Sequence, residues 1–540
     1  QQREGCFLSP GSVDSELANR LSYLLNLHGP SLTVKTACSS SLSALHLANQ
    51  ALVAGECDLA VVAGVNLSLH PQKYLLLDDM QVLSTEKEEK TFDQQASGLI
   101  PSEGVAAIVL QPKATAELEG RPNHGDLMAT SVNHSGSSSG QYIPNLKLLI
   151  ENMDRCFEVA GLEGKKLQYV ETHGTATLLG DPIELRAMER FAQAHNIDHL
   201  TLGSKANLGH MEAASGLASI VKTLLAMSAD QFAPCAYLHK VNDAVDPNDS
   251  PLNLPGSALP WTQDRKVAGV NSFGMGGANG FALLSKSESE LSEFNALPVL
   301  CISAPSKEQL HHQVDAYLQL LAQSPLNTQW LNHARYTSQV GREHFEYRLA
   351  WVGEQINELT TDLSAWLQGE PAGDHLVEYQ LSSDSLVEVL NDSVASQLLQ
   401  QLHQESRWKD IALTWVRGVK ISWSKFYTDS IGSPSFVSLP GHSFKKLDTN
   451  FERALPMLKK LEQKRRSSPN LGSKLLDAES TGIEDWYAPE CVRSVLAEEY
   501  DALIVEALHD GAKEHIAGYW SEILTTFEPE ESIFSTSKQS

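Results

Sequence analysis

The stretch Val34-Lys35-Thr36-Ala37-Cys38-Ser39-Ser40-Ser41-Leu42 joins an extended run to a helical pattern. Residues 32–34 are apolar or β-branched and predict a strand before the turn. After the turn, apolar residues recur at helical spacing, at Leu42, Leu45, Ala48 and Leu52. Cys38 therefore lies at the N-terminus of a helix, where unpaired N–H groups and the helix dipole stabilise an anion. We expect this setting to lower the thiol pKa and to favour the reactive thiolate.

An isolated cysteine is more often a small buried hydrophobe than a nucleophile, so Cys38 alone leaves both interpretations open. The chain has seven cysteines, and the other six lack a comparable setting: Cys6, Cys57, Cys156, Cys235, Cys301 and Cys491. No CxxC pair and no regular spacing occur among them. This pattern argues against a zinc site or a disulfide framework and suits a reducing cytoplasm.

Strands and helices alternate outward from Cys38 to about residue 286. The strands are predicted from short, continuous apolar runs at 59–63, 105–110, 167–171, 200–203, 267–270 and 281–284. Such runs are typical of strands that are buried on both faces. A helix is expected after Gly180, where Asp181-Pro182-Ile183-Glu184 has the order of a capping box with proline at the first helical position. The pattern predicts a layered α/β core.

Two histidines follow two of these strands directly. His173 comes after 167–171, and His210 comes after 200–203. Catalytic groups of α/β sheets gather at the carboxyl ends of strands, so we expect both rings to lie near Cys38. The alternative for each histidine is a hydrogen-bonded structural role. A structural or solvent-exposed role is expected for the histidines without this setting, which are His46, His70 and His134.

A glycine-rich loop completes the set of unusual segments. It spans residues 270–280, with the sequence VNSFGMGGANG, and precedes the strand 281–284. So many glycines suit a tight turn whose backbone N–H groups face a ligand. The GxxxxGK[ST] order of a phosphate-binding loop is absent.

Composition and charge limit the partners. Of the 540 residues, 42% are apolar and 20% are charged, and the net charge of −26 argues against nucleic acid or an anionic membrane. No apolar run is long enough to span a bilayer. The chain starts without methionine or a signal peptide, so we expect a piece of a longer polypeptide.

Three regions are predicted along the chain. The core is expected over 1–286, a second α/β region over 296–450, and an acidic, helical region of unknown role over 455–540, which begins with a polar linker at 459–473. The second region opens with a clear helix. Ser306 and Gln309 form a capping box, followed by an apolar stripe at Leu310, Val314, Tyr317, Leu318 and Leu321.

Four motifs together resemble the ketosynthases of modular polyketide synthases and their fatty acid synthase relatives. They are TACSSSL at 36–42, ETHGTATLLGDPIE at 171–184, SKANLGHMEAASG at 204–216 and NSFGMGGAN at 271–279. Residues 296–450 are similar to the linker subdomain that follows such ketosynthases, through the segments 336–343, 415–418 and 438–444. The resemblance implies a thiolase fold with α-β-α-β-α layers, incomplete at the N-terminus, and a homodimer.

The resemblance also implies residue roles. Cys38 would accept the acyl chain, and His173 and His210 would stabilise the enolate formed when a malonyl-type extender loses CO2. The N–H groups of Cys38 and Met275 would form an oxyanion hole, with Met275 and Phe273 at the gate. Supporting roles would fall to Lys205, Glu212, Thr175 and Asn207. No metal and no directly bound cofactor is expected.

The implied partners follow from this chemistry. They are an acyl carrier protein with its phosphopantetheine arm, a second ketosynthase subunit, neighbouring polyketide synthase domains and a separate, trans-acting acyltransferase. Departures from the family pattern at Lys35, Ala176, Met275 and 279–281 remove no catalytic group, but they leave the acyl-chain preference open.

Other classes fit less well. A degradative thiolase needs a second cysteine near the glycine loop, and 270–284 contains none. A Cys-His-Asn ketosynthase would have asparagine in place of His173 or His210. Two alternatives stay open: a non-elongating ketosynthase that only transfers acyl chains between carrier proteins, and a non-catalytic docking or scaffold fragment, which suits 455–540 best.

Overall fold

The computed structural model describes residues 13–68, 72–84, 86–137, 140, 142–246, 249–287, 291–323, 326–371, 373–380, 392–427 and 434–444. His28–Lys446 forms one compact unit, and the helix α1 (Glu16–Leu25) belongs to another. The expected acidic region 455–540 and its linker lie outside the described residues. No helix in the described part of the chain is long and apolar enough to cross a membrane.

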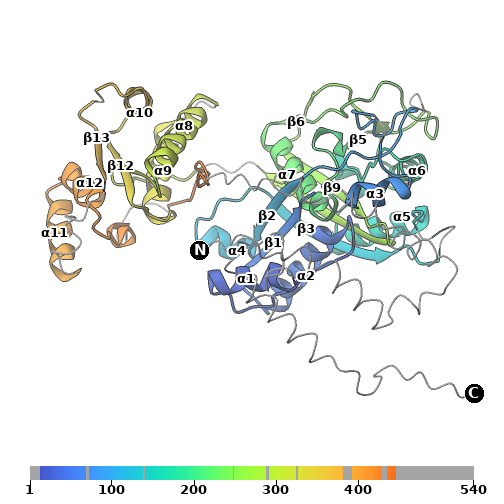
Figure 1. The fold of residues 1–540 in the computed structure, drawn as a ribbon, viewed down its shortest axis with the longest axis horizontal. Coiled ribbons are helices and arrows are strands. Elements are labelled where there is room, and N and C mark those ends of the chain that lie inside the picture. The colour runs from blue at the N-terminus through green and yellow to red at the C-terminus, as the bar shows by residue number, and fades with distance from the viewer. Residues whose placement is uncertain are drawn as a thin grey trace, which may run out of the picture. The chain divides into compact units, whose positions relative to one another are not determined.

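A six-stranded mixed sheet is the centre of the first α/β region of the large unit, residues 28–287 (Figure 1). Its strands, in spatial order, are β3 (Asp126–His134), β10 (Ala278–Ser287), β9 (Arg265–Phe273), β4 (Tyr169–Glu171), β5 (Leu200–Gly203) and β7 (Leu252–Asn253). The neighbours from β9 to β7 pair in parallel, whereas β10 is antiparallel to both β3 and β9. The predicted strands at 167–171, 200–203, 267–270 and 281–284 are confirmed.

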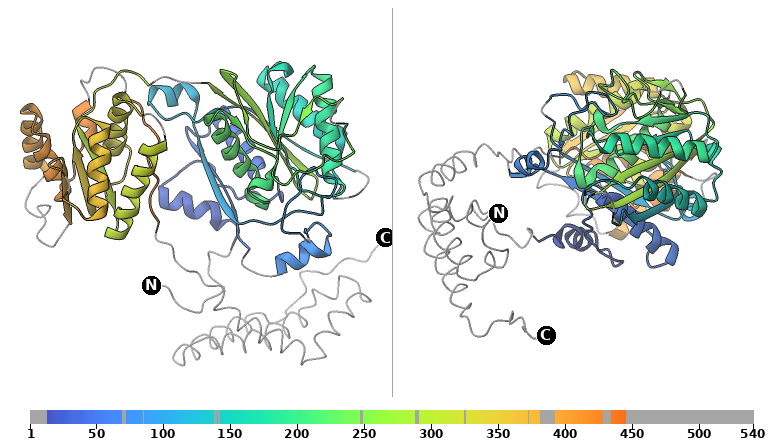
Figure 2. Two further views of the ribbon diagram at one scale, coloured as in Figure 1. Left: turned by 90° about the horizontal axis from the view of Figure 1, so that it is seen from above. Right: turned by 90° about the vertical axis from the view of Figure 1, so that its right-hand side faces the viewer.

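Helices cover both faces of this sheet (Figure 2). On one face α5 (Leu146–Ala160) and α6 (Gly180–Ala194) pack on alternate strand residues such as Val170 and Phe281. On the other face α2 (Ser40–Ala54) and α7 (Ser215–Ser228) pack on the intervening residues, such as Ala268. Because successive side chains of a strand point to opposite faces, one continuous apolar run serves both cores.

A second, two-stranded sheet lies beyond α2 and α7. It pairs β1 (Ala60–Asn66) with β2 (Gly104–Leu110) in an antiparallel register. The strands were expected at these places, but the expectation that both faces are buried is wrong here. One face packs through Val62 and Ile108, and the opposite face, with Val105 and Val109, is exposed. The described residues thus form a helix–sheet–helix–sheet series of layers, four of the five predicted.

Two local predictions are wrong. Residues 32–34 form no strand, and an isolated bridge joins Thr36 and Cys38 just after them. The capping box predicted after Gly180 does not form, because Leu179 is the N-cap residue of α6 and makes no side-chain cap. The carboxylates of Asp181 and Glu184 accept hydrogen bonds from other loops instead.

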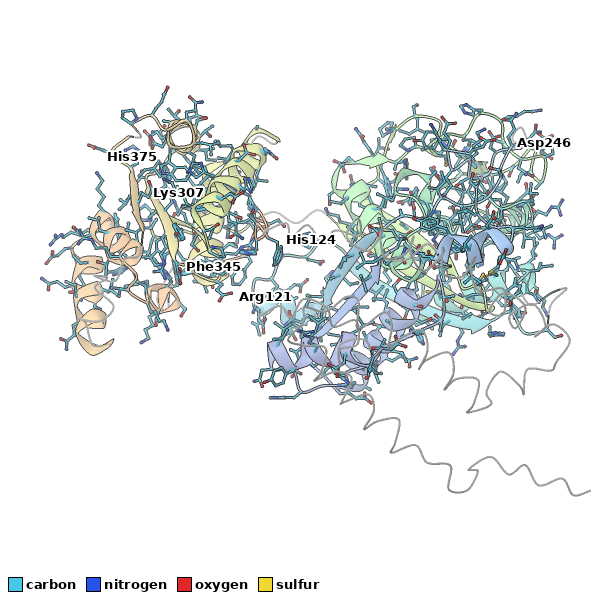
Figure 3. All side chains as sticks on the ribbon, viewed as in Figure 1. Arg121, His124, Asp246, Lys307, Phe345 and His375 are labelled. Atoms are coloured by element: carbon cyan, nitrogen blue, oxygen red, sulfur yellow. The ribbon has the colours of Figure 1, made fainter. Side chains whose placement is uncertain are left out.

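The second α/β region contains a three-stranded antiparallel sheet, β11 (Val299–Ala304), β12 (Tyr347–Val352) and β13 (Leu376–Gln380). Figure 3 labels Lys307, the first residue of one covering helix, and His375, which precedes β13. One face carries α8 (Lys307–Gln323), α9 (Thr328–Val340) and α10 (Ile356–Gln368), and the other carries α11 (Asp392–Gln404) and α12 (Trp408–Val416).

The start of α8 agrees with its predicted cap. The Gln309 N–H donates to Ser306 Oγ at 3.2 Å, and the apolar stripe that includes Leu310 and Val314 lies in the core of this region. The boundaries predicted for the three regions of the chain remain predictions.

Short elements complete the described chain. They are α3 (Gln72–Asp79), α4 (Lys113–Leu118), the paired strands β6 (Gln231–Phe232) and β8 (Leu259–Pro260), and the 3-10 turns η2 (Gly164–Lys166), η3 (Lys205–Asn207), η4 (Glu212–Ala214) and η6 (Trp423–Tyr427).

Candidate active site

Cys38 lies in a tight turn just before α2. Ala37 adopts a left-handed backbone conformation with φ of 53°, which non-glycine residues rarely do. Serine hydroxyls hold the turn, since Ser39 Oγ donates to the Thr36 carbonyl at 2.8 Å and Ser40 Oγ donates to the Ala37 carbonyl at 2.6 Å. The sulfur-bearing residue is thus fixed at the helix N-terminus, as predicted, and it is half-buried.

The expected lowering of the Cys38 pKa is wrong. Burial raises the pKa of this thiol to about 11, and the nearby Glu212 carboxylate raises it further. Lys205 and the backbone N–H groups of Cys38 and Met275 act in the opposite direction without outweighing burial. The free thiol is therefore protonated at neutral pH. The two N–H groups that reach it are those predicted to form the oxyanion hole.

His173 follows β4 on a loop that a buried carboxylate holds. Glu184 of α6 accepts hydrogen bonds from the backbone N–H of His173 at 2.7 Å and from that of Gly174 at 2.8 Å. Gly174 has φ of +32°, and a Cβ there would lie 2.6 Å from Thr91 Cγ2. The loop thus accepts only glycine after the histidine, which explains the His-Gly pair of the motif.

His210 follows β5 and its side chain is fully buried. Its Nδ1 lies 2.9 Å from the backbone N of Glu212 and 2.9 Å from Ser215 Oγ. A backbone N–H can only donate, so Nδ1 must accept and the neutral ring carries its proton on Nε2. Nε2 is buried and has no partner within the described residues, so it is free to donate to a ligand.

The two imidazoles meet. The ring centroids of His173 and His210 are 5.6 Å apart at 89°, and the Phe273 ring lies 5.1 Å from that of His173. Burial lowers the pKa of His210 to about 3, with help from Lys205 and Lys73. Burial, Lys205 and His210 also hold the pKa of His173 well below its usual value. Both rings are therefore neutral at physiological pH.

The glycine loop joins this pair to Cys38. Ser272 Oγ donates to the Cys38 carbonyl at 2.7 Å, one residue before Phe273. Gly274 packs so tightly that a Cβ would lie 2.2 Å from the Thr36 carbonyl oxygen. A larger side chain would push Met275 and its N–H away from the thiol. The loop thus connects the cysteine turn with the histidine pair, as the order of the motifs suggests.

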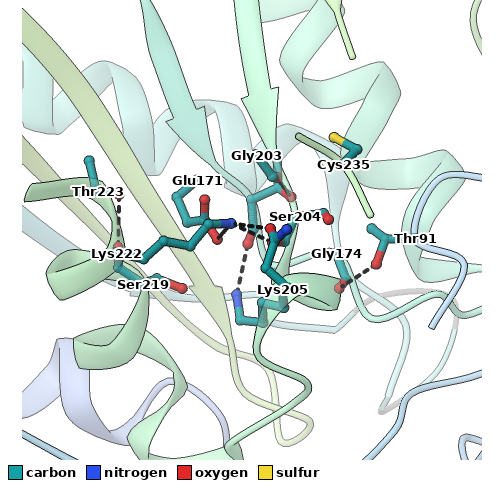
Figure 4. Close-up of polar contacts among 12 residues, drawn as sticks. Thr91, Glu171, Gly174, Gly203, Ser204, Lys205, Ser219, Lys222, Thr223 and Cys235 are labelled. Atoms are coloured by element: carbon teal, nitrogen blue, oxygen red, sulfur yellow. Dashed lines mark hydrogen bonds and ion pairs between the residues drawn. The ribbon is translucent and has the colours of Figure 1, made fainter. Parts of the chain in front are cut away.

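Two lysines, the buried Lys205 and the partly buried Lys222, support the two histidine loops (Figure 4). Lys205 donates to the Thr172 carbonyl at 2.7 Å, and burial lowers its pKa. Lys222 of α7 pairs with the buried Glu171 at 2.9 Å and donates to the Ser204 carbonyl at 2.6 Å. These contacts fix the ends of β4 and β5, from which His173 and His210 project.

The remaining predicted residues support the loops from further away. The Thr175 hydroxyl lies 3.1 Å from that of Thr177, within the His173 loop. Asn207 is exposed, accepts a hydrogen bond from Lys222 at 2.8 Å and donates to the Pro234 carbonyl at 3.1 Å. Glu212 forms an ion pair with Lys73 at 2.7 Å.

Sequence reasoning missed a group of buried carboxyls behind His173. Asp181 accepts from the Phe92 N–H at 2.7 Å and Glu89 from the Ile100 N–H at 2.9 Å, while the Ile100 carbonyl accepts from the His210 N–H. Burial raises the pKa of Asp181 to about 8 and that of Glu89 to about 7. The segment 89–102 thus supports both histidine loops. No motif in the sequence predicts this supporting role.

The layered core with a mixed central sheet is a thiolase-like α/β fold, and its structural neighbours are ketosynthases. A ketosynthase from module 6 of the bacillaene synthase from Bacillus subtilis 168 is 30% identical, with a TM-score of 0.73 over 81% of this chain and 78% of that chain. The oxazolomycin ketosynthase domain OzmH KS7 from Streptomyces albus JA3453 is also 30% identical, with a TM-score of 0.70 over 81% and 73%.

Family models and curated relatives agree. The beta-ketoacyl synthase N-terminal and C-terminal domains match residues 1–116 and 124–239, and the CurL-like polyketide synthase C-terminal model matches 298–363. Polyketide synthase PksL of Bacillus subtilis (strain 168) is 32% identical over 87% of this chain and 11% of its own length. The chain spans about a tenth of the length of the polyketide synthases PksL and PksM of Bacillus subtilis.

The chain therefore belongs to the ketosynthases of modular polyketide synthases and includes the linker subdomain that follows them. It is a condensing enzyme of the polyketide synthase type.

Proposed function

We propose that the chain is an elongating ketosynthase, which joins a Cys38-bound acyl chain to a malonyl-type extender by decarboxylative Claisen condensation. The observation that carries the proposal is the pair of neutral imidazoles, with the buried Nε2 of His210 free to donate. An enzyme that only transfers acyl chains has no enolate to stabilise, so it has no need of two such donors.

In the first half-reaction, the Cys38 sulfur attacks the thioester carbonyl of an acyl chain on a carrier protein. A C–S bond forms to Cys38, the C–S bond to the phosphopantetheine arm breaks, and the departing thiolate takes up the proton that Cys38 loses. The N–H groups of Cys38 and Met275 stabilise the negative oxygen of the tetrahedral intermediate. Their contact with the thiol supports this role.

In the second half-reaction, a malonyl thioester takes the place of the first carrier arm. His173 and His210 donate hydrogen bonds to its carbonyl oxygen. The bond to the carboxylate breaks, CO2 leaves, and the electron pair moves into an enolate that these donors stabilise. The carbanion attacks the acyl carbonyl, a C–C bond forms, the C–S bond to Cys38 breaks, and the released Cys38 thiolate takes up a proton from water. Neutral rings suit this step because each can donate an N–H to developing negative charge.

The proposed partners follow from these steps. The phosphopantetheine arm belongs to an acyl carrier protein, so it arrives as part of the substrate and is not a resident cofactor. A second ketosynthase subunit, neighbouring synthase domains and a trans-acting acyltransferase complete the proposed assembly.

The test is CO2 release from a malonyl-carrier by the full-length protein, compared with His173→Ala. We expect release by the wild type and a loss of about a hundredfold or more in the variant, a size typical of a lost oxyanion donor. Release at the wild-type rate by His173→Ala would exclude the role of this ring. Mass spectrometry should also find an acyl group on Cys38 and none on the same peptide of Cys38→Ala.

A further inference from the structure

Lys73, in the first turn of α3, makes three polar contacts near the histidine pair. Its Nζ lies 2.7 Å from Glu212 Oε1 and donates to Asn66 Oδ1 at 2.9 Å and to Ser68 Oγ at 3.1 Å. Two of the three ammonium donors make hydrogen bonds, to Asn66 and Ser68, and the contact with Glu212 is an ion pair, so the group is held from three sides. The Lys73 and Glu212 side chains are only 20% and 28% exposed, which limits solvent screening of the pair.

Glu212 links this ion pair to His210 through its backbone. Its φ of 41° lies in the left-handed region, which a non-glycine residue adopts only when its surroundings hold it there. In this conformation the Glu212 N–H donates to His210 Nδ1 at 2.9 Å, and that hydrogen bond puts the ring proton on Nε2. The side chain of Glu212 is anchored by Lys73, and Asn66 is in turn anchored by its bond to the Ser102 carbonyl at 2.7 Å.

We propose that Lys73 is a positioning residue of the condensing site: by holding the Glu212 carboxylate, it keeps the Glu212 N–H on His210 Nδ1 and leaves the Nε2 proton for the malonyl thioester. The inference rests on the proposed function, because it assigns Lys73 to the decarboxylation step. Neither the family motifs nor their spacing points to this lysine, which lies 137 positions before His210 in the chain.

The pair also balances charge around the reacting groups. The charged and titratable neighbours of His210 and Cys38 are Lys205, His173, Lys73 and Glu212. Lys73 lowers the pKa of His210, and Glu212 raises the pKa of Cys38. Removing the ammonium would leave the carboxylate without its partner, so the pKa of both His210 and Cys38 would rise.

The experiment compares Lys73→Met, Lys73→Arg and the double variant Lys73→Met/Glu212→Gln in the full-length protein. The matched control is Lys147→Met, because Lys147 pairs with Glu151 at 3.4 Å on the exposed side of α5, far from these contacts in sequence. We expect Lys73→Met to lower CO2 release from malonyl-carrier about tenfold or more. Acyl loading of Cys38 should move to higher pH. Lys73→Arg should recover most of the release, and the control should match the wild type.

The double variant distinguishes two effects of losing Lys73: the loss of the anchor for the residue 212 backbone, and the unbalanced charge of the Glu212 carboxylate. Without the Glu212 charge, acyl loading should return to the wild-type pH profile, whereas CO2 release should stay low because nothing anchors the residue 212 backbone. Selective ¹⁵N labelling of histidine measures the tautomer of His210 directly. A loss of stability alone would not change this tautomer in the folded protein. The His210 signals should report a proton on Nε2 in the wild type and a mixture of tautomers in Lys73→Met.

The outcomes are distinct. Wild-type CO2 release together with an unchanged His210 tautomer in Lys73→Met would overturn the inference and leave the proposed function standing. Full recovery of release in the double variant would also overturn it, since charge alone would then explain the defect. No CO2 release from the wild type itself would overturn the proposed function, and the inference with it.

Discussion

The six-stranded sheet and the β1–β2 pair start from similar apolar runs and end in different environments. In the large sheet, helices cover both faces, and β4 and β5 are buried along their whole length. In the small sheet, one face packs under α2 and α7 while the other is exposed, with 71% of Val105 and 61% of Val109 accessible. A run of apolar residues predicts a strand, but only the tertiary structure decides how many of its faces are covered.

The two sheets also hold different halves of the site. His173 and His210 project from the large sheet and are braced by buried carboxyls and lysines. Cys38 stands before α2, between the two sheets, and its turn is tied to the large sheet through Ser272. The histidine half is therefore expected to be the more rigid one, and the following predictions test that contrast.

The largest effect is expected from a core truncation in the large sheet. Phe281 is 1% exposed, and its ring fills the space over Gly269, where a Cβ would lie 2.5 Å from Phe281 Cζ. Phe281→Ala should reduce the free energy of unfolding by about 3–5 kcal/mol. Val105→Ala on the exposed face of β2 should change it by less than about 0.5 kcal/mol. Chemical denaturation of both variants measures the difference, and equal effects would remove the contrast.

The second effect concerns the thiol. Because burial and Glu212 raise the Cys38 pKa to about 11, the thiolate fraction should rise about tenfold per pH unit between pH 7 and 9. The rate of alkylation by iodoacetamide at Cys38, followed by peptide mapping, should therefore rise about a hundredfold over this range. A plateau below pH 8 would mean that the helix N-terminus dominates after all.

The smallest effect is expected at the carboxylate that holds the His173 loop. Glu184→Gln keeps one acceptor oxygen but places an NH₂ against the second backbone donor. The loss of one buried hydrogen bond should cost about 1–3 kcal/mol of stability. CO2 release should fall more than acyl loading of Cys38, because only the former uses His173. Equal losses in both steps would argue that Glu184 serves the fold and not the histidine.

Much of this arrangement follows from sequence. Continuous apolar runs predicted β4, β5, β9 and β10, helical spacing predicted α2, and the Ser306 cap predicted the start of α8. Strand ends brought His173 and His210 together because the carboxyl ends of parallel strands share one edge. These are local patterns whose physical cause lies within a few residues of the pattern itself.

The rest depends on contacts between distant segments. Asp181 and Glu184 have the spacing of a helix cap, yet their oxygens bind the N–H groups of Phe92 and His173. The helix N-terminus suggested a lower Cys38 pKa, whereas burial and Glu212, which no local pattern reveals, raise it. Residues 32–34 have strand propensity but do not form a strand, so local propensity alone does not decide the structure of this segment.

The most direct test of the central claim is a crystal structure of the full-length protein with a bound non-hydrolysable malonyl-phosphopantetheine mimic. The account predicts that the carbonyl oxygen of the mimic lies about 2.7–3.1 Å from a ring nitrogen of both His173 and His210, with Cys38 Sγ facing its α-carbon. A carbonyl that reaches neither ring, or a sulfur turned away from the mimic, would contradict it.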